Sequence, residues 1–209
     1  MLRPSFRFGD AAFSRVRILR RSRHSLNVSH LPHWNNSGAA QFLTWRLAGS
    51  LPVERTADVW TSEGAKFVAL DRLLDARASG PDWLGRDDVA EAVASVLLAG
   101  PSLGFYELGS WVLMPNHVHV LMRPLVELER VVRGVKATSA RAANRVLGRS
   151  GALWSRDYFD RQVRDSVEEA RIVRYIEGNP VKAGVVPGSG GVALFERFFA
   201  RLKAAPPVK

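Results

Sequence analysis

The sequence predicts an α+β domain built around a central antiparallel β-sheet. Two observations lead to this prediction. Segments with apolar residues at helical spacing are mixed with short strand-like segments. Two of the strand-like segments meet at Pro115-Asn116, where a turn would join them as a hairpin. Mixed helices and strands with a central hairpin are typical of helices packed against an antiparallel sheet.

Three stretches are expected to supply the strands. Residues 39–52, AAQFLTWRLAGSLP, alternate in polarity and end in a turn sequence. Residues 104–124, GFYELGSWVLMPNHVHVLMRP, read as two strands broken at Pro115-Asn116. Residues 152–165, ALWSRDYFDRQVRD, are expected to add another strand.

Four stretches are predicted to be helical, at residues 63–80, 86–100, 125–151 and 166–180. The stretch 125–151 is long and basic. In the last of the four, the apolar side chains at i, i+3 spacing are Val167, Ala170, Val173 and Ile176, and the helix is expected to close at Asn179-Pro180. Residues 192–205, VALFERFFARLKAA, are expected to form a further short amphipathic helix.

Composition narrows the class of protein. The 209 residues include no cysteine, which excludes disulfides and thiolate metal sites. No apolar run approaches the roughly 20 residues needed to cross a bilayer, and the start has no apolar signal segment, so a cytoplasmic protein is expected. The net charge of +10 indicates a polyanionic partner, most often nucleic acid.

Two blocks account for the positive charge. Residues 1–24 hold seven arginines against one acid, and residues 123–164 hold ten basic side chains against four acids. The first block lacks an apolar period, so residues 1–37 are expected to be a basic, flexible arm. A mitochondrial transit peptide and a segment without function are the alternatives for this arm. Residues 38–188 are expected to be the domain and residues 189–209 a tail.

The stretch MPNHVHVLM, residues 114–122, carries the first functional signal. In a strand, His117 and His119 point to one face, while Val118 and Val120 point to the other. Two neighbouring imidazoles can chelate one divalent metal ion. Two half-buried, hydrogen-bonded histidines are the alternative, and Asn116 reads as a turn residue.

A second signal follows in RYIEGNPVKAG, from residue 174. Tyr175 and Asn179 are four residues apart, so on a helix they share a face that differs from the apolar stripe. A phenol can act as a nucleophile when its anion is stabilised, and Asn179 could give a metal an oxygen ligand. The alternatives are a packing aromatic for Tyr175 and a helix N-cap for Asn179.

Taken in order, four motifs resemble the single-tyrosine HUH transposases, and in particular their REP-associated branch. The motifs are QFLTWRLAGSLP, WVLMPNHVHVLMRP, ALWSRDYFDRQVRD and RYIEGNPVKAGVV, and they cover residues 40–187. The resemblance implies a ferredoxin-like domain, a histidine pair that binds Mg²⁺ or Mn²⁺ on a central strand, and a catalytic tyrosine on a facing helix. These residues are His117, His119 and Tyr175 here, with Asn179 as a further metal ligand. It also implies cutting and rejoining of single-stranded DNA at hairpins through a 5′-phosphotyrosine.

DNA contacts are expected from the basic helix and from one aromatic side chain. The candidate residues are Arg130, Arg133, Lys136, Arg141, Arg145 and Trp154. A solvated helix and a core aromatic are the alternatives. Tyr158 competes with Tyr175 as nucleophile but reads as sheet packing or DNA contact, and Tyr106 reads as core.

Other functions remain open at this point. A domesticated relative that binds hairpin DNA or RNA without cutting it would need the basic surface but not the metal ligands. A replication initiator or relaxase would use the same site but usually carries a larger partner domain. We expect no membrane association, and either a monomer or a homodimer.

Overall fold

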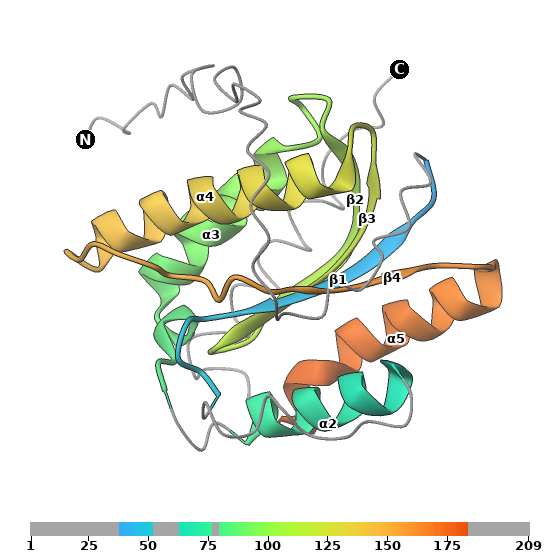
Figure 1. The fold of residues 1–209 in the computed structure, drawn as a ribbon, viewed down its shortest axis with the longest axis horizontal. Helices are drawn as coiled ribbons and strands as arrows, with labels where there is room; N and C mark the ends of the chain where they lie inside the picture. Colours follow the sequence, from blue (N-terminus) through green and yellow to red (C-terminus); the bar gives the residue numbers. More distant parts are fainter. Residues whose placement is uncertain (1–37, 52–62, 77–79, 184–209) are drawn as a thin grey trace, which may run out of the picture. The chain divides into compact units, whose positions relative to one another are not determined.

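The computed structural model describes residues 38–51, 63–76 and 80–183, and its centre is a four-stranded antiparallel sheet (Figure 1). The strands are β1 (Gln41–Arg46), β2 (Tyr106–Leu113), β3 (His117–Pro124) and β4 (Phe159–Gln162). Their order across the sheet is β2-β3-β1-β4, so β1 and β3 are central. The predicted α+β class is confirmed, and this strand order is that of a ferredoxin-like sheet.

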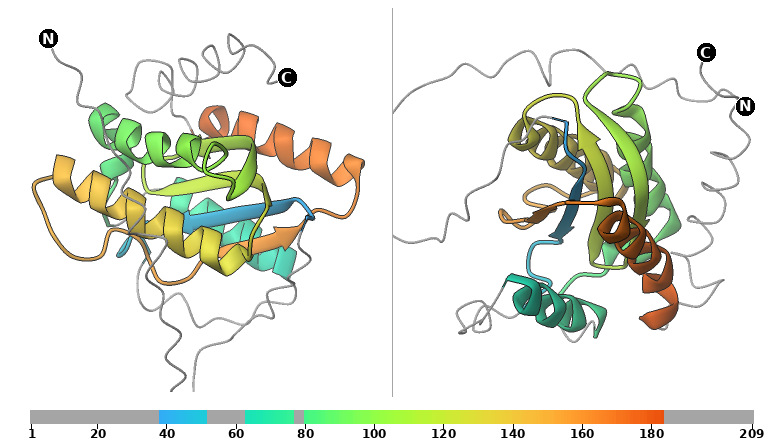
Figure 2. Two further views of the ribbon diagram at one scale, coloured as in Figure 1. Left: turned by 90° about the horizontal axis from the view of Figure 1, so that it is seen from above. Right: turned by 90° about the vertical axis from the view of Figure 1, so that its right-hand side faces the viewer.

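In the part of the chain that the structure describes, four α-helices cover the sheet. They are α2 (Glu63–Asp75), α3 (Asp87–Ala99), α4 (Leu128–Val146) and α5 (Ser166–Lys182), and a short 3-10 helix, η2 (Trp83–Gly85), precedes α3. Helices α3 and α4 lie on one side of the sheet, and α2 and α5 lie on the other (Figures 1 and 2). Each side of the sheet therefore has its own layer of helices.

Strand alternation divides the core into two clusters. Leu43, Trp45, Val118 and Val120 face α3 and α4 and belong to the larger apolar cluster. The neighbouring strand residues Phe42 and Leu121 point to the opposite side, where α2 and α5 lie, and belong to a smaller cluster. The paired register Thr44↔His119 and Arg46↔His117 places both histidines beside β1 on the side of the smaller cluster.

At the end of α3, the backbone lies very close to the ring of Tyr106, a member of the larger cluster. Gly100 follows this helix, and a Cβ at that position would overlap the ring of Tyr106. The Tyr106 hydroxyl donates a hydrogen bond to the carbonyl oxygen of Leu97 at 2.7 Å. Tyr106 is 1% exposed, which confirms it as a core residue, and this burial raises its pKa.

Helix α5 differs from the prediction in two respects. It does not close at Asn179-Pro180 but continues to Lys182, with the Ala183 amide donating to the Asn179 carbonyl at 3.0 Å. Pro180 has no backbone N–H, so one intrahelical hydrogen bond is missing near the end of this helix. Its buried face is also rotated from the predicted stripe, because Val167 is 63% exposed while Tyr175 packs into the smaller cluster.

The remaining predicted elements agree in part. Residues 152–165 form only the four-residue strand β4 and an isolated bridge between Leu47 and Trp154. The expected arm, residues 1–37, and the expected helix at 192–205 lie outside the described residues. Within the described part of the chain, no helix is both long and apolar enough to cross a membrane.

Candidate active site

Strand β3 places His117 and His119 side by side in the protein interior. Both side chains are fully buried, at 0% exposure. Their Nε2 atoms lie 3.1 Å apart, and their ring centroids are separated by 4.7 Å. The two-residue spacing thus brings the imidazoles onto one face, as the strand geometry requires.

Neighbouring side chains orient the two rings through their other nitrogen atoms. The Asn116 amide nitrogen donates to the Leu74 carbonyl at 2.9 Å, which leaves its oxygen to accept from His117 Nδ1 at 2.7 Å. Thr44 Oγ1 lies 2.7 Å from His119 Nδ1. When each Nδ1 carries the hydrogen, both Nε2 atoms have a free lone pair, and these two lone pairs can bind one metal ion. Asn116, predicted only as a turn residue, is therefore a buried support of the site.

The carboxylate of Asp71 lies next to both Nε2 atoms and completes this cluster. It lies on α2, is 2% exposed, and holds Oδ1 at 3.2 Å from His119 Nε2 and 3.8 Å from His117 Nε2. Burial opposes its ionisation, but the interaction with the adjacent His119 imidazole prevails and holds the Asp71 pKa well below its ordinary value. The sequence analysis missed Asp71. The available signal was an acid between Leu70 and Leu74 on the apolar face of a helix.

These three residues fit a divalent metal ion. Their ligand atoms all lie within 4.8 Å of one another, and Asp71 Oδ1 has no hydrogen-bond partner. Burial and the neighbouring His119 lower the His117 pKa well below its usual value, so this imidazole is neutral, as a metal ligand must be. Two imidazoles and a carboxylate form a donor set suited to first-row divalent ions.

Tyr175 lies against this cluster within a group of aromatic rings. Its ring centroid is 5.4 Å from that of His119, 5.8 Å from Phe67 and 5.9 Å from Phe42. The hydroxyl is buried and has no partner in hydrogen-bond geometry. Burial first, and then the nearby Asp71 carboxylate, raise the Tyr175 pKa well above its ordinary value. Burial therefore favours the protonated form of the phenol, which lies close to the histidine pair.

Asn179 lies one turn beyond Tyr175 on the same face of α5. Its side chain is buried, at 1% exposure, and neither its amide oxygen nor its amide nitrogen has a hydrogen-bond partner. A buried amide without partners is costly, so Asn179 is compatible with the predicted role of a metal ligand. The helix N-cap alternative for Asn179 is wrong, because α5 continues through this position.

Two further charged residues border the site, and the sequence analysis identified neither. Lys182 Nζ lies 3.3 Å from Asp71 Oδ2 and 3.4 Å from Asp75 Oδ2. Burial, followed by the charge of Asp71, raises the pKa of Asp75. Burial works against the charge of Lys182, but Asp71 and Asp75 outweigh it and raise the pKa of its ammonium.

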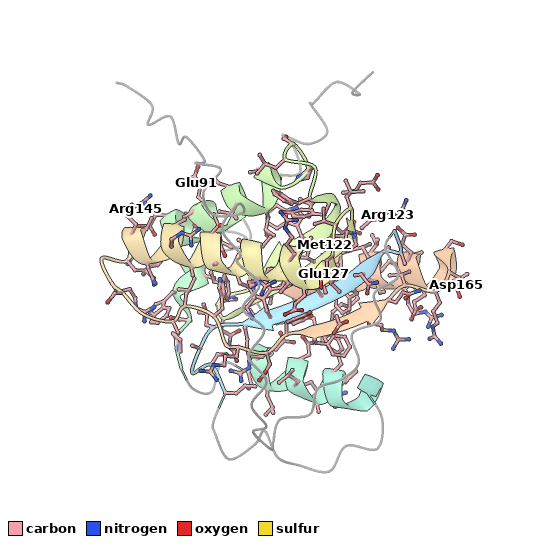
Figure 3. All side chains as sticks on the ribbon, turned by 45° about the horizontal axis from the view of Figure 1, so that its top comes forward. Glu91, Met122, Arg123, Glu127, Arg145 and Asp165 are labelled. Atoms are coloured by element: carbon pink, nitrogen blue, oxygen red, sulfur yellow. The ribbon has the colours of Figure 1, made fainter. Side chains whose placement is uncertain are left out.

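The predicted DNA-binding arginines lie on α4, on the opposite side of the sheet from the histidines (Figure 1). All four of them are exposed: Arg130, Arg133, Arg141 and Arg145. Figure 3 shows Arg145 at the end of α4 remote from Glu127, the residue that precedes the helix. The structure therefore does not bring this basic helix next to the candidate metal ligands.

Two other predicted DNA contacts have structural partners. Lys136 Nζ donates to the Arg156 carbonyl at 2.9 Å, and burial lowers its pKa to about 8. Trp154 is 7% exposed and donates its indole N–H to Ser139 Oγ at 3.0 Å. Stacking of a DNA base on Trp154 stays a prediction, and this burial favours the core alternative. Tyr158 packs on the α4 side of the sheet, away from the histidines.

Part of the chain matches a known protein family. Residues 87–179 match the family described as transposase, IS200-like. The resemblance to the IS200-like transposases is confirmed over this segment. It contains His117, His119, Tyr175 and Asn179, whereas Asp71 lies outside it. No curated protein matches the chain.

Two solved structures are similar to the chain at low identity. One is a REP-associated tyrosine transposase bound to a REP hairpin, with 20% identity, a TM-score of 0.44 and coverage of 76% of each chain. The other, from Deinococcus radiodurans and provisionally described as a transposase, has 19% identity and a TM-score of 0.39, and the match covers 77% of this chain and 98% of that one. At TM-scores below 0.5, neither similarity supports an argument about function.

Proposed function

We propose that the protein is a transposase that cuts and rejoins single-stranded DNA at hairpins through a 5′-phosphotyrosine on Tyr175. The observation that supports this most directly is the position of Tyr175, whose ring centroid is 5.4 Å from that of His119 in a buried cluster completed by His117 and Asp71. A nucleophile beside a set of metal ligands suits metal-assisted phosphoryl transfer to a tyrosine.

The reaction follows from these groups. The Tyr175 oxygen attacks the phosphorus, an O–P bond forms, and the bond from phosphorus to the 3′-oxygen breaks. The phenol loses a proton and the leaving 3′-oxygen gains one, so charge and atoms balance. Because the phosphotyrosine keeps the energy of the phosphodiester, a second 3′-OH can reverse the step, and joining needs no ATP.

The ligands we propose for Mg²⁺ or Mn²⁺ are His117, His119 and Asp71, with Asn179 as a further oxygen donor. When bound, such an ion supplies Lewis-acid stabilisation of the charge that develops on the phosphate. Asp71 lies on α2 and Asn179 on α5, one turn beyond Tyr175, so the two side chains would approach one ion from different helices. The ionised Asp71 also raises the Tyr175 pKa, and compensation of its charge would ease loss of the phenolic proton.

Binding of DNA is proposed to rest largely on charge. The net charge of +10 and the exposed arginines of α4 favour contact with phosphates, and such contacts weaken steeply with salt. Since α4 and the histidines lie on opposite sides of the sheet, one DNA molecule would have to pass an edge of the sheet to reach both. The REP-associated branch, hairpins as targets and a cytoplasmic location belong to this proposal.

The test is cleavage of labelled single-stranded hairpins taken from the flanks of the protein's own gene. With Mg²⁺ or Mn²⁺, the parent protein is expected to give a covalent protein–DNA adduct on a denaturing gel. Tyr175→Phe keeps the ring and its packing, so it is expected to bind DNA but give no adduct. Tyr158→Phe is the matched control and is expected to retain the adduct. Adduct formation by Tyr175→Phe, but not by Tyr158→Phe, would overturn the assignment of the nucleophile.

Metal dependence is tested with the same substrates. A chelator is expected to abolish cleavage, and so is the double variant His117→Ala, His119→Ala. Full cleavage by that variant would contradict the metal site. Hairpins with single-stranded flanks are expected to bind more tightly than a duplex of the same length. Binding of hairpins without any adduct, under every metal tested, would favour the non-catalytic hairpin-binding alternative.

A further inference from the structure

Lys182 is a cation of the site that the chemistry above does not use. It lies seven residues beyond Tyr175 and three beyond Asn179, so the three side chains project from one face of α5. Its Nζ atom is 5.7 Å from the centroid of the Tyr175 ring. The same atom contacts Asp71 Oδ2 and Asp75 Oδ2, at 3.3 and 3.4 Å.

The exposure of these charged groups shows where the site meets solvent. The Lys182 side chain is 51% exposed, whereas Asp71 is 2% and Asp75 12% exposed. Of these three groups, the Lys182 ammonium is therefore the one that an anion arriving from solvent meets first.

The two aspartates hold the ammonium in place. They lie one helical turn apart on α2, and a cation between them relieves their mutual repulsion. One ammonium against two carboxylates leaves one negative charge, which disfavours a phosphate. A bound divalent cation would turn this sum into one positive charge, which favours a phosphate. The charge balance thus couples anion binding at Lys182 to cation binding at the histidines.

On the basis of the proposed function, we propose that Lys182 binds the DNA phosphate that Tyr175 attacks, and that it does so when the divalent cation is bound. Asp71 and Asp75 position the ammonium beside the tyrosine ring in advance, so little side-chain freedom is lost when the phosphate arrives. The competing role is structural: Lys182 would only neutralise the two aspartates.

Equilibrium DNA binding separates these roles. In a Tyr175→Phe background, which prevents cleavage, anisotropy of a labelled hairpin with a single-stranded flank is measured with Mg²⁺ and with a chelator. Lys182→Met is expected to weaken binding about 10- to 100-fold with Mg²⁺, the range for a lost charge-assisted hydrogen bond. The loss is expected to be much smaller with chelator. Lys182→Arg is expected to restore most of the affinity.

The matched control is Arg174→Met, which removes an exposed positive charge from the same helix. Any loss of affinity in this variant is expected to be the same with and without Mg²⁺. If Lys182→Met lowers the melting temperature but binds DNA like the background protein in both conditions, Lys182 only neutralises the aspartates and this inference is wrong. If the background protein does not bind the hairpin at all, the proposed function fails first, and the inference fails with it.

Discussion

The hydroxyl of Thr44 offers a sharp test of how the fold prepares the histidine pair. Thr44 lies opposite His119 in the register of β1 and β3, and its Oγ1 is 2.7 Å from His119 Nδ1. Thr44→Val replaces the hydroxyl with a methyl group of similar size in a buried position. The change therefore removes one hydrogen bond and leaves packing almost unaltered.

Two effects are expected from Thr44→Val. A buried imidazole N–H without a partner costs about 1–3 kcal/mol of folding free energy. For a domain of this size, each kcal/mol lowers the melting temperature by about 2–4 °C, which predicts a decrease of about 2–12 °C. Because the hydroxyl also holds the His119 ring in its orientation, affinity for Mn²⁺ is expected to fall about 10- to 100-fold.

Calorimetry and Mn²⁺ titration of the purified protein measure the two effects separately. Thr44→Ser is the control, because it keeps the hydroxyl and loses only a methyl group, and its Mn²⁺ affinity is expected to remain close to that of the parent. Unchanged Mn²⁺ affinity in Thr44→Val, with the parent binding Mn²⁺ normally, would refute the argument that Thr44 orients His119 for a metal.

Three further predictions concern the fold. The pKa of Glu168 is held at about 2, chiefly by its hydrogen bond with Arg164. Its interactions therefore contribute folding stability in full above the unfolded pKa of 4.5, and this contribution is lost as pH falls towards 2. Because the partner arginines are largely exposed, Glu168→Gln is expected to cost only about 1 kcal/mol at neutral pH, and urea unfolding should show this difference vanish in acid. Tyr106→Phe is expected to cost about 1–2 kcal/mol by thermal unfolding, because it leaves a buried carbonyl without its donor. Gly100→Ala is expected to cost about 1–3 kcal/mol, since the added methyl overlaps the Tyr106 ring, and a melting temperature equal to that of the parent would contradict the packing found there.

The sequence by itself determined which side chains share a face within a single strand or helix. The two-residue period of a strand placed His117 and His119 on one face, with Val118 and Val120 in the core behind them. The four-residue spacing of Tyr175 and Asn179 placed both on one face of α5. Local periodicity decides such relations, so no knowledge of packing was needed. The same reasoning misplaced the end of α5, because Asn-Pro usually marks a boundary and here does not.

Only the tertiary structure decided which elements meet. Asp71 lies 46 residues before His117, and the sequence shows it only as an acidic residue among leucines. Packing of α2 on the sheet brings its carboxylate to 3.2 Å from His119 Nε2. Lys182 joins the site because α5 packs beside α2. The basic helix α4 lies on the other side of the sheet, and Trp154 is in the core. Such contacts depend on how amphipathic faces are paired across the whole chain, and no local period encodes that pairing.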